Sequence, residues 1–572
     1  MCGVYGISYK NRDIVDQMIK DCSHRGPDGQ DIYVDEKVTL GHNLLFITEN
    51  PEQSRQPWKT PNGNILTYNG EIFNYYELVH KYKDKFIPKT KCDTELLAWG
   101  LDNFGYNFIE QIDSMHAFVF YDKQKQQLIL STDHLGIKPL YYAIENNNLI
   151  FSSEIKSMLA NVKNSNQVSK EGIASFQYCG MNVLDQTIFN KIKKLTPGET
   201  IIYDLYNKKI LEKKYQRIVP QPNHYFDPDE FREQVRNTVK MTSIGIRDFG
   251  IFLSGGLDSS IVAYEMNKVN PNTKTFTNRF EVKDDFKLDQ GYNSDANVAK
   301  LLAQQENFNH TEVLITPDIL CEYWEGASKY NEECIQNPSN FVYYYTNKFM
   351  KQNGVTITMS GDMGDELFTG YHNHLNFTIK HKVKTSQQFV DYFAKLNSAS
   401  PFNMSEQYPI EEIRKKFKKL YVDDIWNEQD PLGSYMAIEC LTVVPNEFLR
   451  RNDKFGMANS IEGRFPFTTK SFMNYCFSIH SSEKINYKTG ELKLPSKIAY
   501  QHLLPKDLLT KVKTGWSAPF GHWLHTNKGC KNLLLKSVDW PGPHKKAGLK
   551  TYKKLFRKWL YNDWKRNYNL YN

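Results

Sequence analysis

Long apolar runs are missing from this sequence of 572 residues. No run of about 18 apolar residues occurs, so no transmembrane helix and no membrane partner are expected. The first residues, MCGVYGISYKNRD, lack the basic stretch followed by an apolar stretch that is typical of a secretory signal. We therefore expect a cytoplasmic protein.

Paired cysteine motifs are also missing. The nine cysteines are odd in number, and no two have the CxxC spacing. This argues against a disulfide framework and against a zinc site. Cys2 differs from the others because it follows the initiator methionine directly, and the other eight are expected to be buried or incidental thiols.

Basic residues are in excess only at the end of the chain. The net charge is +7, but residues 543–572 alone hold nine basic residues and one acid. The remaining chain is nearly neutral, which is not typical of an enzyme with a basic nucleic-acid cleft, so no nucleic-acid partner is expected. The tail places Leu549, Tyr552, Phe556 and Trp559 on one helical face. This pattern predicts a helix docked on its own domain, with a partner or an anionic surface as the alternative.

The spacing of apolar residues changes along the chain. Up to about residue 210, short runs of β-branched and aromatic residues are separated by turns, as in ILTYNGEIFNY and AFVFYDKQKQQLILSTD. Later, the buried strands FGIFL and VTITM are each followed by a turn and a helix, which indicates a parallel α/β sheet. From about residue 385 the spacing is mostly helical. The proline-rich stretch RIVPQPNHYFDPDE separates the two patterns, and we predict domains of residues 1–215 and 216–572.

Cys2 is a candidate nucleophile. Removal of Met1 would leave the thiol on the residue that carries the α-amine, whose pKa of about 8 lets it act as the base. Asn69 and Gly70 follow a strand and offer a side-chain amide and a backbone N–H, as an oxyanion hole needs. Asp93 could bind a substrate ammonium. On position alone, however, Cys2 is more simply an ordinary strand residue.

Several ordered motifs change that balance. The segments MCG, RGPDG, NGEIFNY, DTE, DHLGIKPLYY and FSSEIKSM resemble the glutaminase domain of class II glutamine amidotransferases over about residues 2 to 200. The resemblance implies an α+β sandwich of the N-terminal-nucleophile hydrolase type. It also implies that Cys2 is the nucleophile and that Asn69 and Gly70 form the oxyanion hole. With these two residues, Glu71 and Asp93 would bind glutamine.

One position departs from that family. Leu44 stands where the family has an arginine that pairs with the α-carboxylate of glutamine. Losing such a bidentate pair should cost about 1.5–3 kcal/mol. Arg55 lies nearby in sequence and could compensate.

A second candidate centre follows the strand FGIFL. The segment SGGLDSS has two glycines that let the backbone approach a ligand, and its N–H groups face a helix N-terminus, which suits an anion. No GK[ST] follows, so it is not a Walker A loop. A ligand-free glycine turn is the alternative. The segment resembles the pyrophosphate loop (PP-loop) of ATP pyrophosphatases, and SGDMGDELFTGY, which begins at Ser360, resembles a segment of asparagine synthetases, with Met363 and Thr369 in place of glycines.

The resemblance extends to the end of the chain. The stretch from Asn452 to Phe467 resembles the D…MA…E.R.PF segment of asparagine synthetases, and Lys513, Gly515, Trp516, Pro519 and Trp523 match K.GF..P…W. Lys493 has the spacing of the catalytic lysine, with Lys497 as a rival for that role and a surface lysine as the plain alternative. The chain thus resembles glutamine-hydrolysing asparagine synthetases, which implies an α/β PP-loop domain with a helical C-terminal part.

The resemblance implies these site residues. ATP would be bound by Leu253, Ser254, Gly255, Gly256, Asp258, Ser259, Asn278, Ser360 and Gly361. Mg²⁺ would be bound by Asp258 and Asp365, and Asp362 and Lys493 would serve catalysis.

The implied function is ATP-dependent amidation of a carboxylic acid, most simply L-aspartate to L-asparagine. It would proceed through an acyl-adenylate with ammonia from glutamine, and release AMP and pyrophosphate. Ammonia would then need an internal passage between the two sites. Another acceptor acid, such as a sugar or secondary-metabolite acid, is the first alternative, kept open by the unusual Leu44, Asn278-Arg279, Met363 and Thr469. A non-catalytic nucleotide-binding relative is the second, and a homodimer stays open.

Overall fold

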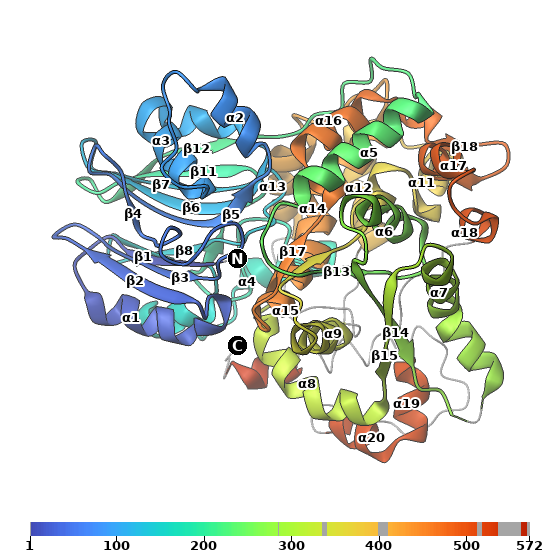
Figure 1. Cartoon of the computed structure of the whole chain (residues 1–572). Coiled ribbons are helices and arrows are strands. Elements are labelled where there is room, and N and C mark those ends of the chain that lie inside the picture. Colours follow the sequence, from blue (N-terminus) through green and yellow to red (C-terminus); the bar gives the residue numbers. More distant parts are fainter. Residues whose placement is uncertain are drawn as a thin grey trace.

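The computed structural model describes residues 2–283, 285–333, 340–397, 410–511, 518–535 and 562–568. Within these ranges no helix is long and apolar enough to cross a membrane. Figure 1 shows a β-sandwich built from the start of the chain beside a larger part in which helices surround a second type of sheet.

Two antiparallel sheets of six strands form the first part, in the orders β10-β8-β9-β1-β3-β2 and β12-β11-β7-β6-β5-β4. The strands of the first sheet are β1 (Gly3–Ile7), β2 (Gly29–Val34), β3 (Thr39–Leu44), β8 (Tyr141–Glu145), β9 (Asn148–Ser152) and β10 (Lys193–Lys194). Those of the second are β4 (Trp58–Lys59), β5 (Ile65–Ile72), β6 (Ser114–Asp122), β7 (Gln127–Thr132), β11 (Glu199–Asp204) and β12 (Lys209–Tyr215).

Side chains alternate between the two faces of each strand, and this places a core on each side of each sheet. In β1, Val4 points into the core between the two sheets, while Tyr5 and Ile7 belong to the core on the opposite face. Helix α1 (Arg12–Asp21) covers that outer face, and α3 (Asp93–Phe104) covers the outer face of the second sheet. The remaining helices of this part are α2 (Tyr75–Lys81) and α4 (Lys170–Cys179). This helix–sheet–sheet–helix arrangement confirms the predicted sandwich.

The second part contains a parallel sheet of five strands in the order β15-β14-β13-β16-β17. Its strands are β13 (Phe249–Phe252), β14 (Lys274–Phe280), β15 (Asn309–Ile315), β16 (Ile357–Met359) and β17 (Glu462–Arg464). The helices up to β16 are α5 (Pro228–Thr242), α6 (Leu257–Val269), α7 (Phe286–Gln305), α8 (Pro317–Asn331) and α9 (Asn340–Gln352). The parallel sheet is the one that the strand–turn–helix pattern predicts.

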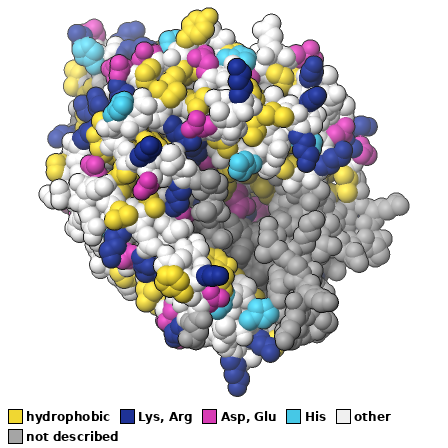
Figure 2. Space-filling view, turned by 90° about the vertical axis from the view of Figure 1, so that its right-hand side faces the viewer, with side chains coloured by type: hydrophobic (Ala, Val, Ile, Leu, Met, Phe, Trp, Pro, Cys, Tyr) yellow, Lys and Arg dark blue, Asp and Glu magenta, His cyan; other side chains and the backbone are white. Residues whose placement is uncertain are grey.

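Beyond β16 the described chain is mainly helical, as expected. Its helices are α10 (Gly364–Leu367), α11 (His372–Asn376), α12 (Ser386–Asn397), α13 (Ile410–Phe417), α14 (Pro431–Val443), α15 (Arg450–Met457), α16 (Lys470–Ser478), α17 (Leu494–Tyr500), α18 (Lys506–Thr510), α19 (Phe520–Thr526) and α20 (Lys528–Leu535). A small hairpin pairs β18 (Ile485–Asn486) with β19 (Glu491–Leu492). Figure 2 shows charges of both signs mixed over the coloured part of one face.

The two parts share apolar cores. One core cluster joins Leu45 and Phe73 of the sandwich to Val235 and Ile357 of the second part. Strand β12 ends at Tyr215 and α5 begins at Pro228; the exact domain boundaries stay a prediction.

The described end of the chain bridges both parts. Trp564 packs in the core under α1, against Phe189, and its Nε1 donates to the Glu332 carbonyl at 2.6 Å. The Asp563 carboxylate accepts from Trp324 Nε1 at 3.1 Å. This segment therefore contacts the first domain as well as its own. The four apolar residues on which the docking prediction rested lie outside the described residues.

Candidate functional site

Cys2 is buried at the start of β1, where its neighbours are polar. Its Sγ lies 4.0 Å from the Leu45 carbonyl, and its backbone nitrogen donates to Asn69 Oδ1 at 2.8 Å. Arg25 Nε donates to the Cys2 carbonyl at 3.2 Å. Burial raises the pKa of the Cys2 thiol, so this thiol needs a nearby base to become a thiolate. The nitrogen held by Asn69 is the one that becomes the α-amine when Met1 is removed.

Strand β5 brings Asn69 and Gly70 beside the thiol. Among the described residues, the buried Nδ2 of Asn69 has no hydrogen-bond partner, so it is an oriented donor that a substrate oxygen could satisfy. Gly70 lines the pocket next to Cys2. A Cβ at residue 70 would collide with the Met115 carbonyl of the paired strand β6, which explains the glycine.

Two buried carboxylates complete this pocket. Asp93 begins α3, and its Oδ2 accepts from Tyr68 Oη at 2.8 Å and from the Ile72 N–H at 2.9 Å. Burial raises the pKa of Asp93 to about 6. Burial and the nearby Asp93 raise the pKa of Glu71, and Arg464 opposes that rise from 3.0 Å. The pocket thus gathers Cys2, Gly70, Glu71 and Asp93, four of the residues predicted for it.

Leu44 lines the same pocket at the end of β3. Arg55, the residue that could compensate for the missing arginine, has an exposed side chain and is not among the described residues that line the pocket. Its neighbours Ser54 and Gln56 line the pocket instead. These neutral side chains can donate to a carboxylate but cannot neutralise it.

The glycine-rich loop lies between β13 and α6, at the carboxyl end of the parallel sheet. Gly255 has φ = +76°, and a Cβ there would collide with the Asp295 carbonyl, so both its backbone conformation and its surroundings need glycine. Ser254 and Ser259 contact each other through their hydroxyls at 2.9 Å. Asp258 stands in the first turn of α6, beside the N–H groups that an anion would meet.

The acidic turn after β16 packs directly against this loop. A Cβ at Gly361 would collide with the Ser259 nitrogen, and one at Gly364 with the Asp258 carboxylate. Asp365 Oδ1 lies 2.6 Å from Lys493 Nζ, and Lys493 is also ion-paired with Asp258. The structure therefore brings Asp258, Asp365 and Lys493 together.

The residues present fit Mg²⁺ bound together with phosphate oxygens. Asp258 Oδ1 is buried without a hydrogen-bond partner among the described residues, and Asp365 comes from the facing turn. Mg²⁺ is usually bound by one or two carboxylates plus substrate phosphates rather than by a complete protein cage. The described residues contain no group of three or more His, Cys, Asp or Glu side chains that could hold a metal ion.

The other predicted residues lie around this centre. Asp362 Oδ2 accepts from Ser360 Oγ at 2.6 Å and from Asn452 Nδ2 of α15 at 3.0 Å. Asn278 Oδ1, on β14, accepts from Thr346 Oγ1 at 2.7 Å. The rival Lys497 pairs with Glu491 at 2.9 Å, and the geometry thus favours Lys493.

The two substituted glycine positions both have a left-handed backbone. Met363 has φ = +79° and Thr369 has φ = +61°, and both side chains are buried. Such values are uncommon for residues other than glycine, so this turn holds local strain. Lys513, Gly515 and Trp516 lie outside the described residues, whereas Trp523 is buried and donates from Nε1 to the Glu281 carbonyl at 2.8 Å.

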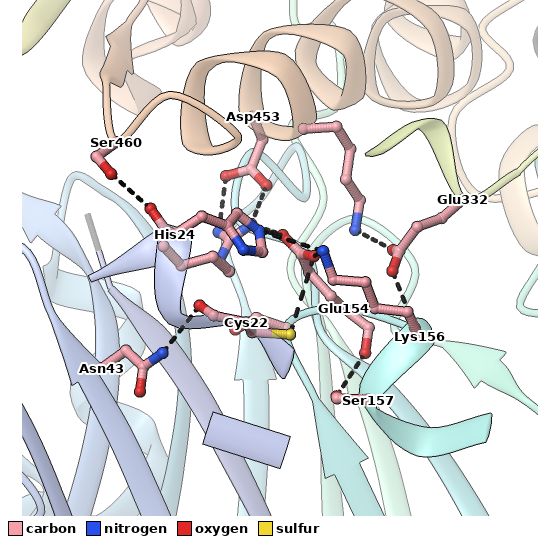
Figure 3. A network of polar contacts seen from close by, with 12 residues as sticks. Cys22, His24, Asn43, Glu154, Lys156, Ser157, Glu332, Asp453 and Ser460 are labelled. Atoms are coloured by element: carbon pink, nitrogen blue, oxygen red, sulfur yellow. Dashed lines mark hydrogen bonds and ion pairs between the residues drawn. The ribbon is translucent and has the colours of Figure 1, made fainter. Parts of the chain in front are cut away.

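A buried polar network joins the two domains close to Cys2. Arg25 donates to both carboxylate oxygens of Asp453 on α15, at 2.9 and 3.1 Å, and to Glu154 at 3.0 Å. Figure 3 shows Glu154, Lys156 and Asp453 converging at this junction, with Glu332 beside Lys156. The neighbour of Asp453 in α15, Asn452, is the residue that contacts Asp362.

Comparison with known families decides the assignment. The model of the glutamine amidotransferase domain matches residues 1–216, and that of asparagine synthase matches residues 230–570. The chain belongs to the asparagine synthase family. Its resemblance to the glutamine-hydrolysing asparagine synthetases is confirmed, and it is an enzyme of asparagine synthase-type, glutamine-dependent amidation.

Relatives in this family match nearly the whole chain. Asparagine synthetase (glutamine-hydrolyzing) 1 of Bacillus subtilis (strain 168) is 25% identical, over 94% of this chain and 90% of its own. Asparagine synthetase B (glutamine-hydrolyzing) of Escherichia coli (strain K12) is 23% identical, over 92% and 84%. The solved glutamine phosphoribosylpyrophosphate amidotransferase from B. subtilis covers 47% of this chain and 64% of its own, with 17% identity and a TM-score of 0.29.

Sequence reasoning missed two residues at the pocket beside Cys2. Glu462 lines it, and Arg464 contacts Glu71, yet both come from β17 of the second domain. The sequence shows them only as part of the E.R.PF segment. Because 393 positions separate Glu71 from Arg464, no local spacing could have paired them.

Proposed function

We propose that this member of the asparagine synthase family amidates a carboxylic acid, most simply L-aspartate to L-asparagine. The acceptor carboxylate would attack ATP, form an acyl-adenylate and release pyrophosphate, and ammonia would then displace AMP. One observation carries the proposal. The ammonium of Lys493 lies between the carboxylates of Asp258 and Asp365. The two segments that carry these aspartates face each other at the carboxyl end of a parallel sheet. That site suits the phosphates of ATP bound with Mg²⁺, and the resemblance of SGGLDSS to the PP-loop favours pyrophosphate as the leaving group.

In the first half-reaction, Cys2 would supply the nucleophile. The α-amine held by Asn69 Oδ1 accepts the thiol proton, and the sulfur attacks the amide carbon of glutamine. Asn69 Nδ2 and the Gly70 N–H bind the oxygen that becomes negative. The amine then returns the proton to the leaving nitrogen, so that ammonia departs and a thioester remains. Water hydrolyses this thioester to glutamate and restores Cys2.

In the second half-reaction, the protein's main task is to stabilise charge. The ammonium of Lys493 faces the position of the phosphates, and the Gly255–Gly256 backbone lets them approach the start of α6. Asp258 and Asp365 would hold Mg²⁺, which neutralises charge on the departing pyrophosphate when it is bound. Asp362, fixed by Ser360 and Asn452, would help to position the reacting groups.

A different acceptor acid is the second candidate. The strained positions Met363 and Thr369 lie in the acidic turn, where their side chains occupy space that glycines would leave open. A sugar or secondary-metabolite acid in place of aspartate would use the same activation chemistry. We further propose a cytoplasmic location, because the eight described cysteines are free thiols.

Mass spectrometry of the products from ATP, glutamine and aspartate tests the proposal. Asparagine, AMP, pyrophosphate and glutamate in matching amounts would support it in full. AMP and glutamate formed only with another acid would support the second candidate. If ADP and phosphate form in proportion to the amide product, the acyl-adenylate route is wrong.

A further inference from the structure

The glutamine pocket is completed by a strand of the other domain. Glu462, at the start of β17, lines the pocket together with Cys2, Glu71 and Asp93. Arg464, at the end of the same strand, contacts Glu71. The amidotransferase domain therefore does not supply all of this pocket's surroundings itself.

The side chain of Arg464 is fully buried and held on several sides. Its Nε donates to Glu462 Oε1 at 2.5 Å, and its Nη1 donates to the carbonyls of Thr242 and Ile244 at 3.0 and 2.8 Å. With its planar group fixed in this way, Nη2 donates to Glu71 Oε2 at 3.0 Å. Because three hydrogen bonds already fix the guanidinium, its Nη2 can direct the fourth hydrogen bond in one direction only.

Glu71 needs such a partner to act on a substrate cation. It is 4% exposed and stands near Asp93, which is 5% exposed. Burial and this second carboxylate raise the pKa of Glu71 well above its usual value, and Arg464 limits that rise by favouring the charged form. A neutral or misdirected Glu71 would lose most of its attraction for the ammonium of glutamine.

We propose that Arg464, although it belongs to the synthetase domain, is a positioning residue for glutamine that orients the carboxylate of Glu71 at the pocket and favours its charged form. This inference rests on the proposed role of the pocket as the glutamine site. Arg464 itself does not touch the substrate. Its effect passes through Glu71, so it should act on glutamine binding rather than on the chemistry at Cys2.

The backbone of Arg464 contacts the other active site. Its carbonyl accepts from the Ser360 N–H at 3.3 Å, at the start of the acidic turn, and β17 pairs in parallel with β16. The main chain of Arg464 thus supports the acidic turn, and its side chain supports the glutamine pocket. Side-chain substitution leaves the main-chain contact in place, which allows the two roles to be separated.

The test is steady-state glutamine hydrolysis by the full chain carrying Arg464→Met. We expect the KM for glutamine to rise at least about tenfold, as for loss of a charged hydrogen bond. The kcat should stay within a few-fold, because Cys2, Asn69 and Gly70 are unchanged. Arg464→Lys, which keeps the charge, should restore part of the lost affinity. Ammonia-dependent synthesis should persist in both variants.

Two further variants exclude a general loss of structure. Arg450→Met removes another largely buried arginine, ion-paired with Glu333 at 2.7 Å, and should leave the glutamine KM unchanged. In a Glu71→Gln background, Arg464→Met should raise the KM by much less than it does alone, because the two residues act as one unit. If Arg464→Met folds poorly, Arg464→Lys takes its place in the cycle.

Three results would overturn the inference. They are an unchanged KM in folded Arg464→Met, effects of Glu71→Gln and Arg464→Met that simply multiply, and an equal rise in KM for Arg450→Met. If the unsubstituted chain hydrolyses no glutamine, the proposed function itself fails and this inference fails with it. If the unsubstituted chain hydrolyses glutamine and Arg464→Met has the same KM for glutamine, only the inference about Arg464 is refuted.

Discussion

Leu44 gives the sharpest prediction about glutamine use. Its side chain is 5% exposed and lines the pocket that also contains Glu71 and Asp93. These carboxylates suit the ammonium of glutamine, but the described lining residues include no cation for the α-carboxylate. We therefore expect a high KM for glutamine, and we expect Leu44→Arg to lower it.

The size of the effect follows from the missing pair. A bidentate guanidinium–carboxylate contact stabilises a complex by about 1.5–3 kcal/mol, which corresponds to roughly 10- to 150-fold in KM. The kcat should change little, because the contact is the same in the ground state and in the transition state. The aliphatic part of the new arginine covers much of the apolar surface that Leu44 covers, which limits the loss of folding stability.

The assay is glutamine hydrolysis across a range of glutamine concentrations, with thermal unfolding measured in parallel. Leu44→Met is the neutral control of similar volume and should not lower the KM. Arg55→Ala should also leave the KM unchanged, because the Arg55 side chain is exposed. If Leu44→Arg folds normally and its KM does not fall, the α-carboxylate does not bind beside residue 44. A wild-type KM that is already low would refute the physical reasoning as well.

Three other predictions concern the two sites. Cys2→Ala should reduce glutamine-dependent synthesis by a factor of order 10³ or more, while ammonia-dependent synthesis persists at high pH. Lys493→Ala should abolish synthesis with either nitrogen source but keep glutamine hydrolysis. Both results are measured by comparing the product formed from ammonium with the product formed from glutamine. Asp258→Asn and Asp365→Asn should each lose most AMP and pyrophosphate release, because each removes a charge that would face Mg²⁺, and full activity in either variant would remove that residue from the metal site. The KM for glutamine should rise as the pH falls below about 6, because protonated Asp93, whose pKa is about 6, no longer attracts an ammonium; a flat KM between about pH 5 and 8 would contradict this.

Matched variants control these measurements. Cys179→Ala removes a thiol that is also buried but lies in an apolar core, and it should keep glutamine-dependent synthesis. Lys497→Ala removes the neighbouring lysine that pairs with Glu491, and it should keep synthesis with either nitrogen source. Loss of both activities in folded Cys2→Ala would refute the two-site arrangement.

The sequence predicts many of the strands because they are short runs of β-branched and aromatic residues separated by turns. In β1, Val4 faces one apolar core while Tyr5 and Ile7 face another, so the strand shows no alternation of apolar and polar residues in the sequence. The glycine-rich loop and the acidic turn were also predictable, since each follows a short buried strand. That these segments lie at one sheet edge follows from the parallel topology.

Contacts between distant segments could not be predicted in this way. The pairing of Arg464 with Glu71 depends on how two domains meet, and no local pattern records that geometry. The same is true of Arg25, whose RGPD turn indicates a tight bend but not the bidentate contact to Asp453. The resemblance identified the residue types at both active sites, and only the structure shows which of them touch.

The position of Trp564 has a consequence for how the chain is made. Its indole packs against Phe189 in the apolar core beneath α1, and the same core contains Tyr5, near the opposite end of the sequence. Domains usually fold during synthesis in the order in which they leave the ribosome. Here the side-chain packing of the amino-terminal sandwich is completed only after translation has passed Trp564. A nascent or truncated chain that stops before Trp564 therefore leaves the apolar side chains of this core without their indole neighbour.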